Sequence, residues 1–194
     1  MFILSPTVLT TDKIKLIPLT LDHHNDYYLA GNSTELWRWI PTNPCINIES
    51  AKAWLTTAVA AMKKGEQLAF MIFDIASNSY VGSTRLFKPN KKDASIEIGH
   101  TFIQPEFQRS YVNTHAKYLL LRHSFEQLLI TRVEFCTHEH NEKSCNAIVR
   151  IGGKFEGVLR KHRRLSDGSY RNTTLFSITD DEWPQIKEQL ESKI

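Results

Sequence analysis

The sequence predicts an α+β fold, in which helices cover both faces of a mixed, mostly antiparallel sheet (an α/β/α sandwich). Three strand-like segments follow one another over residues 67–103, and the turn "ASNS" between the first two suits a hairpin. A further strand at 131–137 directly follows a long helix, which predicts a right-handed crossover and one central parallel strand pair. The 194 residues, 41% of them hydrophobic, are enough for one buried core, so we expect a single domain over 1–194.

Periodicity and chain-breaking residues divide the sequence into alternating elements. Strands are expected at 13–19, 67–75, 79–87, 94–103, 131–137, 155–165 and 169–179. Helices are expected at 20–31, 48–65, 112–129, 141–152 and 179–190, with another helical turn or two over 33–41. The last two strands form a hairpin around "SDG". The final helix opens with T-x-x-E, a capping-box pattern.

Two of these helices are defined by their apolar faces. The helix at 48–65 ends at a glycine and places five residues on one face: Ala51, Trp54, Leu55, Ala58 and Met62. The helix at 112–129 is apolar on most of its circumference, which predicts packing on two sides.

Composition narrows the class of protein. The formal net charge of +3 is too small to indicate a nucleic-acid partner. The three cysteines include no C-x-x-C pair, which favours a reducing intracellular compartment. The N-terminal segment lacks the pattern of a signal peptide, and no apolar run reaches the roughly 18 residues that span a bilayer. We therefore expect a cytoplasmic protein with no membrane partner.

The stretch "QPEFQRSYVNTHAKYLLLRHSFE" (104–126) runs from a strand end through a loop into a helix. Free backbone N–H groups and the helix dipole favour an anion at such a position. Five side chains could add donors: Gln108, Arg109, Ser110, Asn113 and Thr114. The forked guanidinium of Arg109 suits phosphate oxygens. The alternative is that these polar residues only cap the helix.

The segment "IEIGHTFIQPEFQRSYVNTHAKYLLLRHSFE" resembles the central motif of the GNAT superfamily of acyl-CoA-dependent N-acetyltransferases. It is most similar to the branch of ribosomal-protein N-terminal acetyltransferases (RimJ/RimL-like). Residues 141–183 resemble the family's C-terminal part, and residues 9–23 its opening strand. The resemblance therefore covers nearly the whole chain.

This resemblance implies acetyl-CoA as cosubstrate. Its pyrophosphate would rest on the backbone of a cradle formed by Gln108, Arg109, Ser110, Tyr111, Val112, Asn113 and Thr114. Its pantetheine arm would pair with a splayed strand at Thr101, Phe102 and Ile103, and Asn141 and Ser144 would reach the pantetheine or the thioester. The family's two glycine positions hold Tyr111 and Asn113 here, which indicates a variant cradle because a side chain narrows the space for close backbone approach.

Amine acetylation needs a neutral amine, an oxyanion donor and a proton for the departing thiolate. By resemblance, Glu97 would be the base and Ser144 would donate to the sulfur. The alternatives are a surface or paired carboxylate at 97 and an ordinary first-turn serine at 144. A backbone N–H near Phe102 is the natural oxyanion donor, and Tyr170 or His100 could replace any of these groups.

Other residues have bland and functional interpretations. Cys136, His138 and His140 alternate like ligands on one strand face, but a fourth ligand is not apparent, so no metal is expected. The basic run "RKHRR" (160–164) could meet an acidic partner, although a solvated hairpin is the simpler interpretation. Cys145 is interpreted as a structural thiol.

The predicted reaction is direct acetyl transfer to a primary amine in a ternary complex. The acceptor would be a protein N-terminus or a small amine, and the enzyme could form a homodimer. Trp37 and Trp39, between the N-terminal helices, either border the acceptor pocket or belong to the core. Two alternatives remain: a GNAT-fold binding protein without catalysis, suggested by Tyr111 and His115, and a ribosome- or RNA-associated module that uses "RKHRR".

Overall fold

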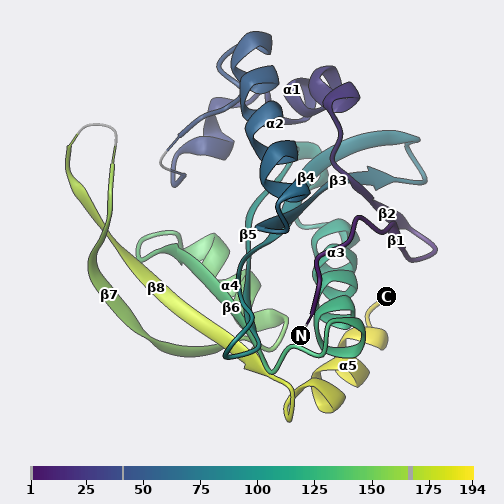
Figure 1. The fold of residues 1–194 in the computed structure, drawn as a ribbon, viewed down its shortest axis with the longest axis vertical. Coiled ribbons are helices and arrows are strands. Elements are labelled where there is room, and N and C mark those ends of the chain that lie inside the picture. The colour runs from purple at the N-terminus through teal and green to yellow at the C-terminus, as the bar shows by residue number, and fades with distance from the viewer. Residues whose placement is uncertain (1, 41, 166–167) are drawn as a thin grey trace.

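A computed structural model describes residues 2–40, 42–165 and 168–194 (Figure 1). Its sheet has the strand order β1-β2-β3-β4-β5-β6-β8-β7. The strands are β1 (Leu9–Thr10), β2 (Ile14–Pro18), β3 (Gln67–Asp74), β4 (Ser79–Asn90), β5 (Ser95–Ile103), β6 (Arg132–His138), β7 (Lys154–Arg164) and β8 (Tyr170–Thr179). Every neighbouring pair is antiparallel except β5 with β6. The predicted mixed α+β sheet is confirmed, and the short β1 is an addition to it.

The helices follow the predicted order with shifted ends. They are α1 (His24–Gly31), α2 (Ile48–Lys63), α3 (Tyr111–Arg122), α4 (Glu142–Arg150) and α5 (Trp183–Glu191). Short 3-10 turns occur as η1 (Leu21–His23), η2 (Thr34–Trp37) and η3 (Pro105–Phe107). None of the helices in the described part of the chain has the length and apolar character to cross a membrane.

Two predicted helix boundaries were wrong. The helix expected at 112–129 changes after Arg122 into a π-helical turn, η4 (His123–Gln127). The last helix begins at Trp183 instead of 179, because the Glu182 carboxylate accepts from the Thr179 amide (2.9 Å) and holds residues 179–182 as a turn before it. The hairpin turn predicted around "SDG" includes residues 166–167, which lie outside the described part of the chain.

Helices cover both faces of the sheet. Adjacent residues of β4 mark the two sides: Thr84 contacts Lys117 of α3, whereas the Arg85 guanidinium lies 4.5 Å from the Trp54 ring of α2. We call the second side the α2 face. Helix α5 packs on α3, where the Tyr118 hydroxyl donates to Glu191 (2.7 Å). Helix α3 is buried around most of its circumference, as its sequence predicts.

The parallel pair β5–β6 is short. It covers only Ser95–Glu97 of β5 and Arg132–Glu134 of β6. Beyond these residues β5 continues beside β4, and β6 continues beside β8, so the two strands diverge. In Figure 1 the β6–β8–β7 arm curves away from the rest of the sheet. The divergence opens a gap within the sheet, and the loop that leads into α3 starts at its end.

Candidate active site

The loop after β5 is shaped by its own hydrogen bonds. Ser110 caps α3: its Oγ accepts from the Val112 amide (3.3 Å) and donates to the Phe107 carbonyl (2.6 Å). The Gln108 side-chain amide donates to the carbonyl of Ile103 (2.9 Å), the last residue of β5. Of the polar residues in the sequence motif, Ser110 therefore caps the helix, as the bland interpretation expected, whereas Gln108 binds the strand end.

The same loop has the features of an anion cradle. The amides of Tyr111 and Asn113, in the first turn of α3, have no carbonyl four residues earlier within the helix. Arg109 sits just before them with a left-handed backbone (φ +60°) and an exposed side chain. It has no ion pair among the described residues. Free amides, the helix dipole and an unpaired guanidinium together favour a phosphate-sized anion.

Tyr111, at one of the family's glycine positions, has its side chain anchored on the sheet. Its hydroxyl donates to Oδ1 of Asp74 at the end of β3 (2.6 Å), and its ring lies edge-on to His115. Burial raises the pKa of Asp74, but the hydrogen bonds from Tyr111 and Ser77 outweigh it and hold the pKa below its usual value. The side chain at 111 is thus directed toward β3, which removes the main objection to a cradle without glycine at that position.

The end of β5 is irregular. His100 has φ +47°, and the register with β4 contains one extra β5 residue between Gly99 and Phe102, which is a β-bulge. The Thr101 hydroxyl accepts from Lys117 Nζ (2.6 Å) on the α3 side. Phe102 packs with its ring centroid 5.0 Å from that of Trp37. The side chains of Thr101 and Phe102 are thus engaged with the core, and a ligand in the gap would meet their backbone.

Lys117 is a buried amine with unusual surroundings. Only 6% of its surface is exposed, and its hydrogen-bond acceptors are two hydroxyls, those of Thr101 and Thr84 (3.4 Å). Burial lowers its pKa to about 7. The sequence pattern did not single out Lys117 as a site residue. A charged residue amid buried positions was the available signal.

Glu97 is a paired carboxylate. It is 5% exposed, and it accepts a hydrogen bond from Lys88 Nζ. Cys136 of β6 lies beside it, and burial together with this carboxylate raises the pKa of that thiol to about 12. The structure therefore places Glu97 at the point where β5 and β6 separate, with the Lys88 ammonium paired to it.

Helix α4 faces the loop across the gap. Asn141 caps the helix by accepting from the Ser144 amide (3.1 Å). The Ser144 hydroxyl is half-buried and makes no hydrogen bond to another described residue. Lys143 donates to Oε1 of Gln108 and so links α4 to the loop before α3. Asn141 and Ser144 therefore stand on the opposite side of the gap from the loop.

The segment between α1 and α2 covers part of the α2 face. The Trp39 carbonyl accepts from Arg171 of β8 (3.0 Å), and the Trp39 ring lies beside that of His138. Trp37 is buried, and its indole N–H donates to the Gly31 carbonyl (2.8 Å). Its ring also lines a small pocket on this face. Trp37 thus belongs to the core, and it also lines a pocket that Trp39 does not reach. The pocket is small and is lined by Tyr27, Trp37, Ile40, Thr42, Pro44, Trp54, Arg85 and His100.

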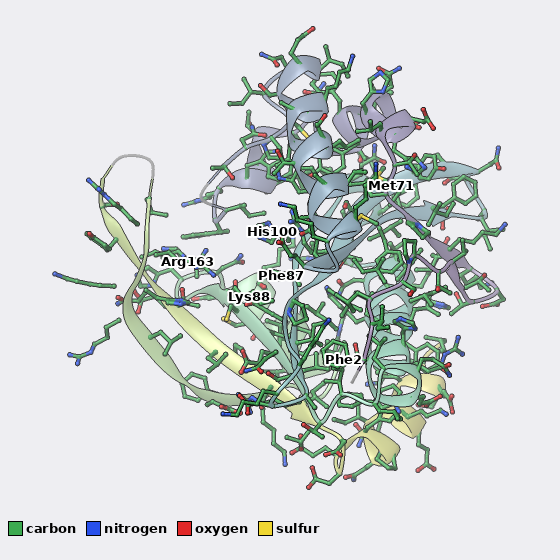
Figure 2. The ribbon with its side chains drawn as sticks, viewed as in Figure 1. Phe2, Met71, Phe87, Lys88, His100 and Arg163 are labelled. Atoms are coloured by element: carbon green, nitrogen blue, oxygen red, sulfur yellow. The ribbon has the colours of Figure 1, made fainter. Side chains whose placement is uncertain are left out.

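Basic groups surround this face. In Figure 2, His100, Phe87 and Lys88 lie on the side of β4 and β5 that faces Arg163 of β7. Partial burial, and then the charges of Arg85, Arg163, Lys88 and Arg171, lower the pKa of His100 although part of its surface is exposed, so its imidazole is neutral at pH 7. Arg85 was missed by sequence reasoning, and a lone arginine in the apolar strand "SYVGSTRLF" was the available signal.

Two other sequence features take simple roles. Within the described residues, no three His, Cys, Asp or Glu side chains are grouped as a metal would require. His138 packs against His140 at 5.4 Å between ring centroids, while Cys136 lies beside Glu97. In the basic run 160–164, Arg163 is half-buried and the other residues are exposed on the hairpin.

Comparison with known proteins identifies relatives over most of the chain. Residues 13–154 match the acetyltransferase (GNAT) domain family. The N-acetyltransferase YoaA of Bacillus subtilis, itself uncharacterized, is 22% identical over 171 residues, which cover 88% of this chain and 96% of YoaA.

Solved structures share the fold. A GCN5-related N-acetyltransferase from Brucella melitensis superposes with a TM-score of 0.89 at 27% identity, covering 97% of this chain and 85% of that one. RimJ of Mycobacterium smegmatis, solved in complex with CoA-disulfide, has a TM-score of 0.86 at 20% identity, covering 100% and 97% of the two chains. At 20% identity, the similarity to RimJ is evidence for the fold alone.

Proposed function

Because the chain belongs to the GNAT acetyltransferase family, we propose that it transfers the acetyl group of acetyl-CoA to a primary amine by direct attack in a ternary complex. One observation carries this proposal. Strands β5 and β6 diverge after Glu97 and Glu134, and the gap ends at a helix N-terminus with free amides. An extended arm that ends in a pyrophosphate matches such a gap and cradle.

Each part of acetyl-CoA has a counterpart among the described residues. The pyrophosphate would be held by the loop and first turn at 108–114, with Arg109 as the charged donor. The pantetheine would hydrogen-bond to the free backbone edge at 101–103. From the other side of the gap, Asn141 still has its side-chain N–H groups, because its oxygen caps α4.

The chemistry requires three proton or charge adjustments. The amine must lose a proton, for which Glu97 and the neutral His100 are the nearby acceptors on the α2 face. An amide near Phe102 would stabilise the oxyanion. The Ser144 hydroxyl, which makes no hydrogen bond to a described residue, would give a proton to the departing thiolate.

The proposal is tested by measuring thiol release from acetyl-CoA against a panel of small amines and N-terminal peptides. Thiol release that depends on one of these amines is the expected result. Titration calorimetry and thermal shift with acetyl-CoA at millimolar concentration accompany it. Binding without turnover would favour the inactive binding protein, and neither heat nor a thermal shift would contradict the proposal.

Arg109→Ala is expected to weaken acetyl-CoA binding by about 1–3 kcal/mol, the range for a hydrogen bond to a charged group. The measurement is the dissociation constant from titration calorimetry. Arg160→Ala is the matched control, because it removes an exposed arginine of β7 outside the cradle. An unchanged constant for Arg109→Ala would remove this residue from the cradle.

Glu97→Gln is expected to lower kcat by roughly 10²–10⁴-fold while acetyl-CoA affinity stays near wild type, because positioned bases contribute rate enhancements of that size. Glu134→Gln is the control, since Glu134 is the register partner of Glu97 on β6 and pairs with Arg132 instead. The rates are compared from pH 6 to 9. Equal turnover across that range would exclude Glu97 as the base.

A further inference from the structure

Arg85 carries a buried charge that lacks a counterion. It is 8% exposed, and its Nη1 donates to Oε1 of Gln67 (2.7 Å). Its Nη2 is buried without a hydrogen-bond partner, and no carboxylate in residues 2–40, 42–165 or 168–194 is within ion-pair distance. Burial lowers the pKa of Arg85 to about 10, so the guanidinium is still charged at pH 7.

Burying a guanidinium without a counterion lowers the stability of the folded protein. A buried charge normally has a paired and hydrogen-bonded partner, and a free buried donor forfeits its hydration. The cation–π contact with Trp54 offsets part of this cost but does not use Nη2. The unused N–H donors of Nη2 therefore indicate a site whose hydrogen-bond partner comes from outside the chain.

The pocket beside Arg85 offers a second donor. The Tyr27 hydroxyl has no hydrogen-bond partner among the described residues, and burial raises its pKa well above the usual value, so it keeps its proton. Apolar and aromatic groups, including Trp37 and Ile40, form the remaining wall. Besides these two donors, the polar residues Thr42 and His100 line the pocket, and no described acid does, which favours an anionic over a cationic ligand.

We propose that the acceptor amine carries a carboxylate, which binds in this pocket to Arg85 and Tyr27. This inference rests on the proposed acetyl transfer and names the class of acceptor. Arg163, which has no ion pair among the described residues, supports it, because it adds positive potential over the same face. The acid on that face, Glu97, is already paired with Lys88.

Register places the pocket close to the reaction centre. On β4, Arg85 lies opposite Gly99 and Phe87 lies opposite Glu97, so Arg85 and Glu97 share the α2 face. Two residues along a strand span roughly 7 Å. The amine near Glu97 and the carboxylate at Arg85 would thus belong to a single residue of the acceptor molecule. Either an amino acid with a free α-carboxylate or a peptide whose first side chain is acidic has this spacing.

The test compares matched acceptors in the thiol-release assay. One arm uses alanine against alanine amide, and the other uses peptides that begin with Asp against the same peptides beginning with Asn. We expect the carboxylate member of at least one pair to have a kcat/KM roughly 10- to 100-fold higher. In Arg85→Gln this ratio should fall to about one, while Arg38→Gln, an exposed arginine of the same segment as Trp39, should keep it.

A binding measurement separates the two proposals. Thermal shifts are recorded without acetyl-CoA for N-acetylalanine against its amide, and for N-acetylaspartic acid amide against N-acetylasparagine amide. Stabilisation by a carboxylate ligand that Arg85→Gln loses would support the pocket even if no acetylation occurred. Acetylation with equal rates for both members of each pair would overturn the pocket and leave acetyl transfer intact. The pocket proposal is also overturned if the carboxylate ligands give neither a rate preference nor a thermal stabilisation.

Discussion

The free energy of unfolding should rise by about 4 kcal/mol more in the wild type than in Lys117→Met between pH 7 and pH 10. Burial lowers the folded-state pKa of Lys117 to about 7, whereas an unfolded lysine titrates near 10.4. Between these values the unfolded chain binds a proton that the folded chain does not, so stability increases with pH by about 1.4 kcal/mol per unit. Below pH 7 both states are protonated and the dependence vanishes.

Urea unfolding at pH 6.5, 8 and 9.5 measures this difference. Methionine has nearly the same length as lysine and no charge, so it removes the titration with little change in volume. Lys13→Met is the control, because Lys13 is exposed on the surface. If Lys117→Met and the wild type showed parallel pH profiles, the Lys117 amine would not be desolvated as its burial requires.

Gly82→Ala is expected to lower the free energy of unfolding by about 3 kcal/mol or more, at the upper end for overpacked sites. A methyl group at residue 82 would lie 2.2 Å from the carbonyl oxygen of Phe102 and 3.0 Å from Cα of Ile103. Both are backbone atoms, so β5 itself would have to move. Because the displaced segment is the proposed pantetheine edge, acetyl-CoA affinity should fall in parallel.

Gly65→Ala separates this close approach from general glycine effects. No atom lies within 4 Å of a Cβ at residue 65, but its φ of +71° makes alanine unfavourable there by about 1–2 kcal/mol. This control should lose some stability and keep wild-type acetyl-CoA affinity. A Gly82→Ala protein with wild-type unfolding would show that β4 and β5 can separate without cost.

The sequence predicted the order of the elements well, because each depends on local patterns. The crossover from β5 through α3 to β6 follows from one apolar helix between two short β-branched segments. The cap at Ser110 follows from the residues next to it. The start of the last helix at 183 was missed because the bond from the Thr179 amide to Glu182 leaves residues 179–182 as a turn. The π-helical turn after 122 was missed because it contacts another element, through Trp183 donating to Glu126 (3.0 Å).

The side-chain partners in the site could not be read from the sequence. Glu97 meets Lys88 nine residues away only because β4 and β5 pair, and Tyr111 meets Asp74 across 37 residues. Arg85 and Lys117 interrupt apolar segments, but a one-dimensional pattern does not show which neighbours surround them when they are buried. Their burial depends on the α2 face and on α3, which the chain brings to the sheet from distant segments.

The divergence of β5 from β6 gives the molecule two internal strand edges. Residues 98–103 and 135–138 each pair on one side, so their backbone groups toward the gap lack a strand partner. Unpaired edges are templates on which an extended segment of another chain can add a strand. A ligand arm lying between these edges would also protect against aggregation, and we therefore expect self-association to start from the ligand-free enzyme.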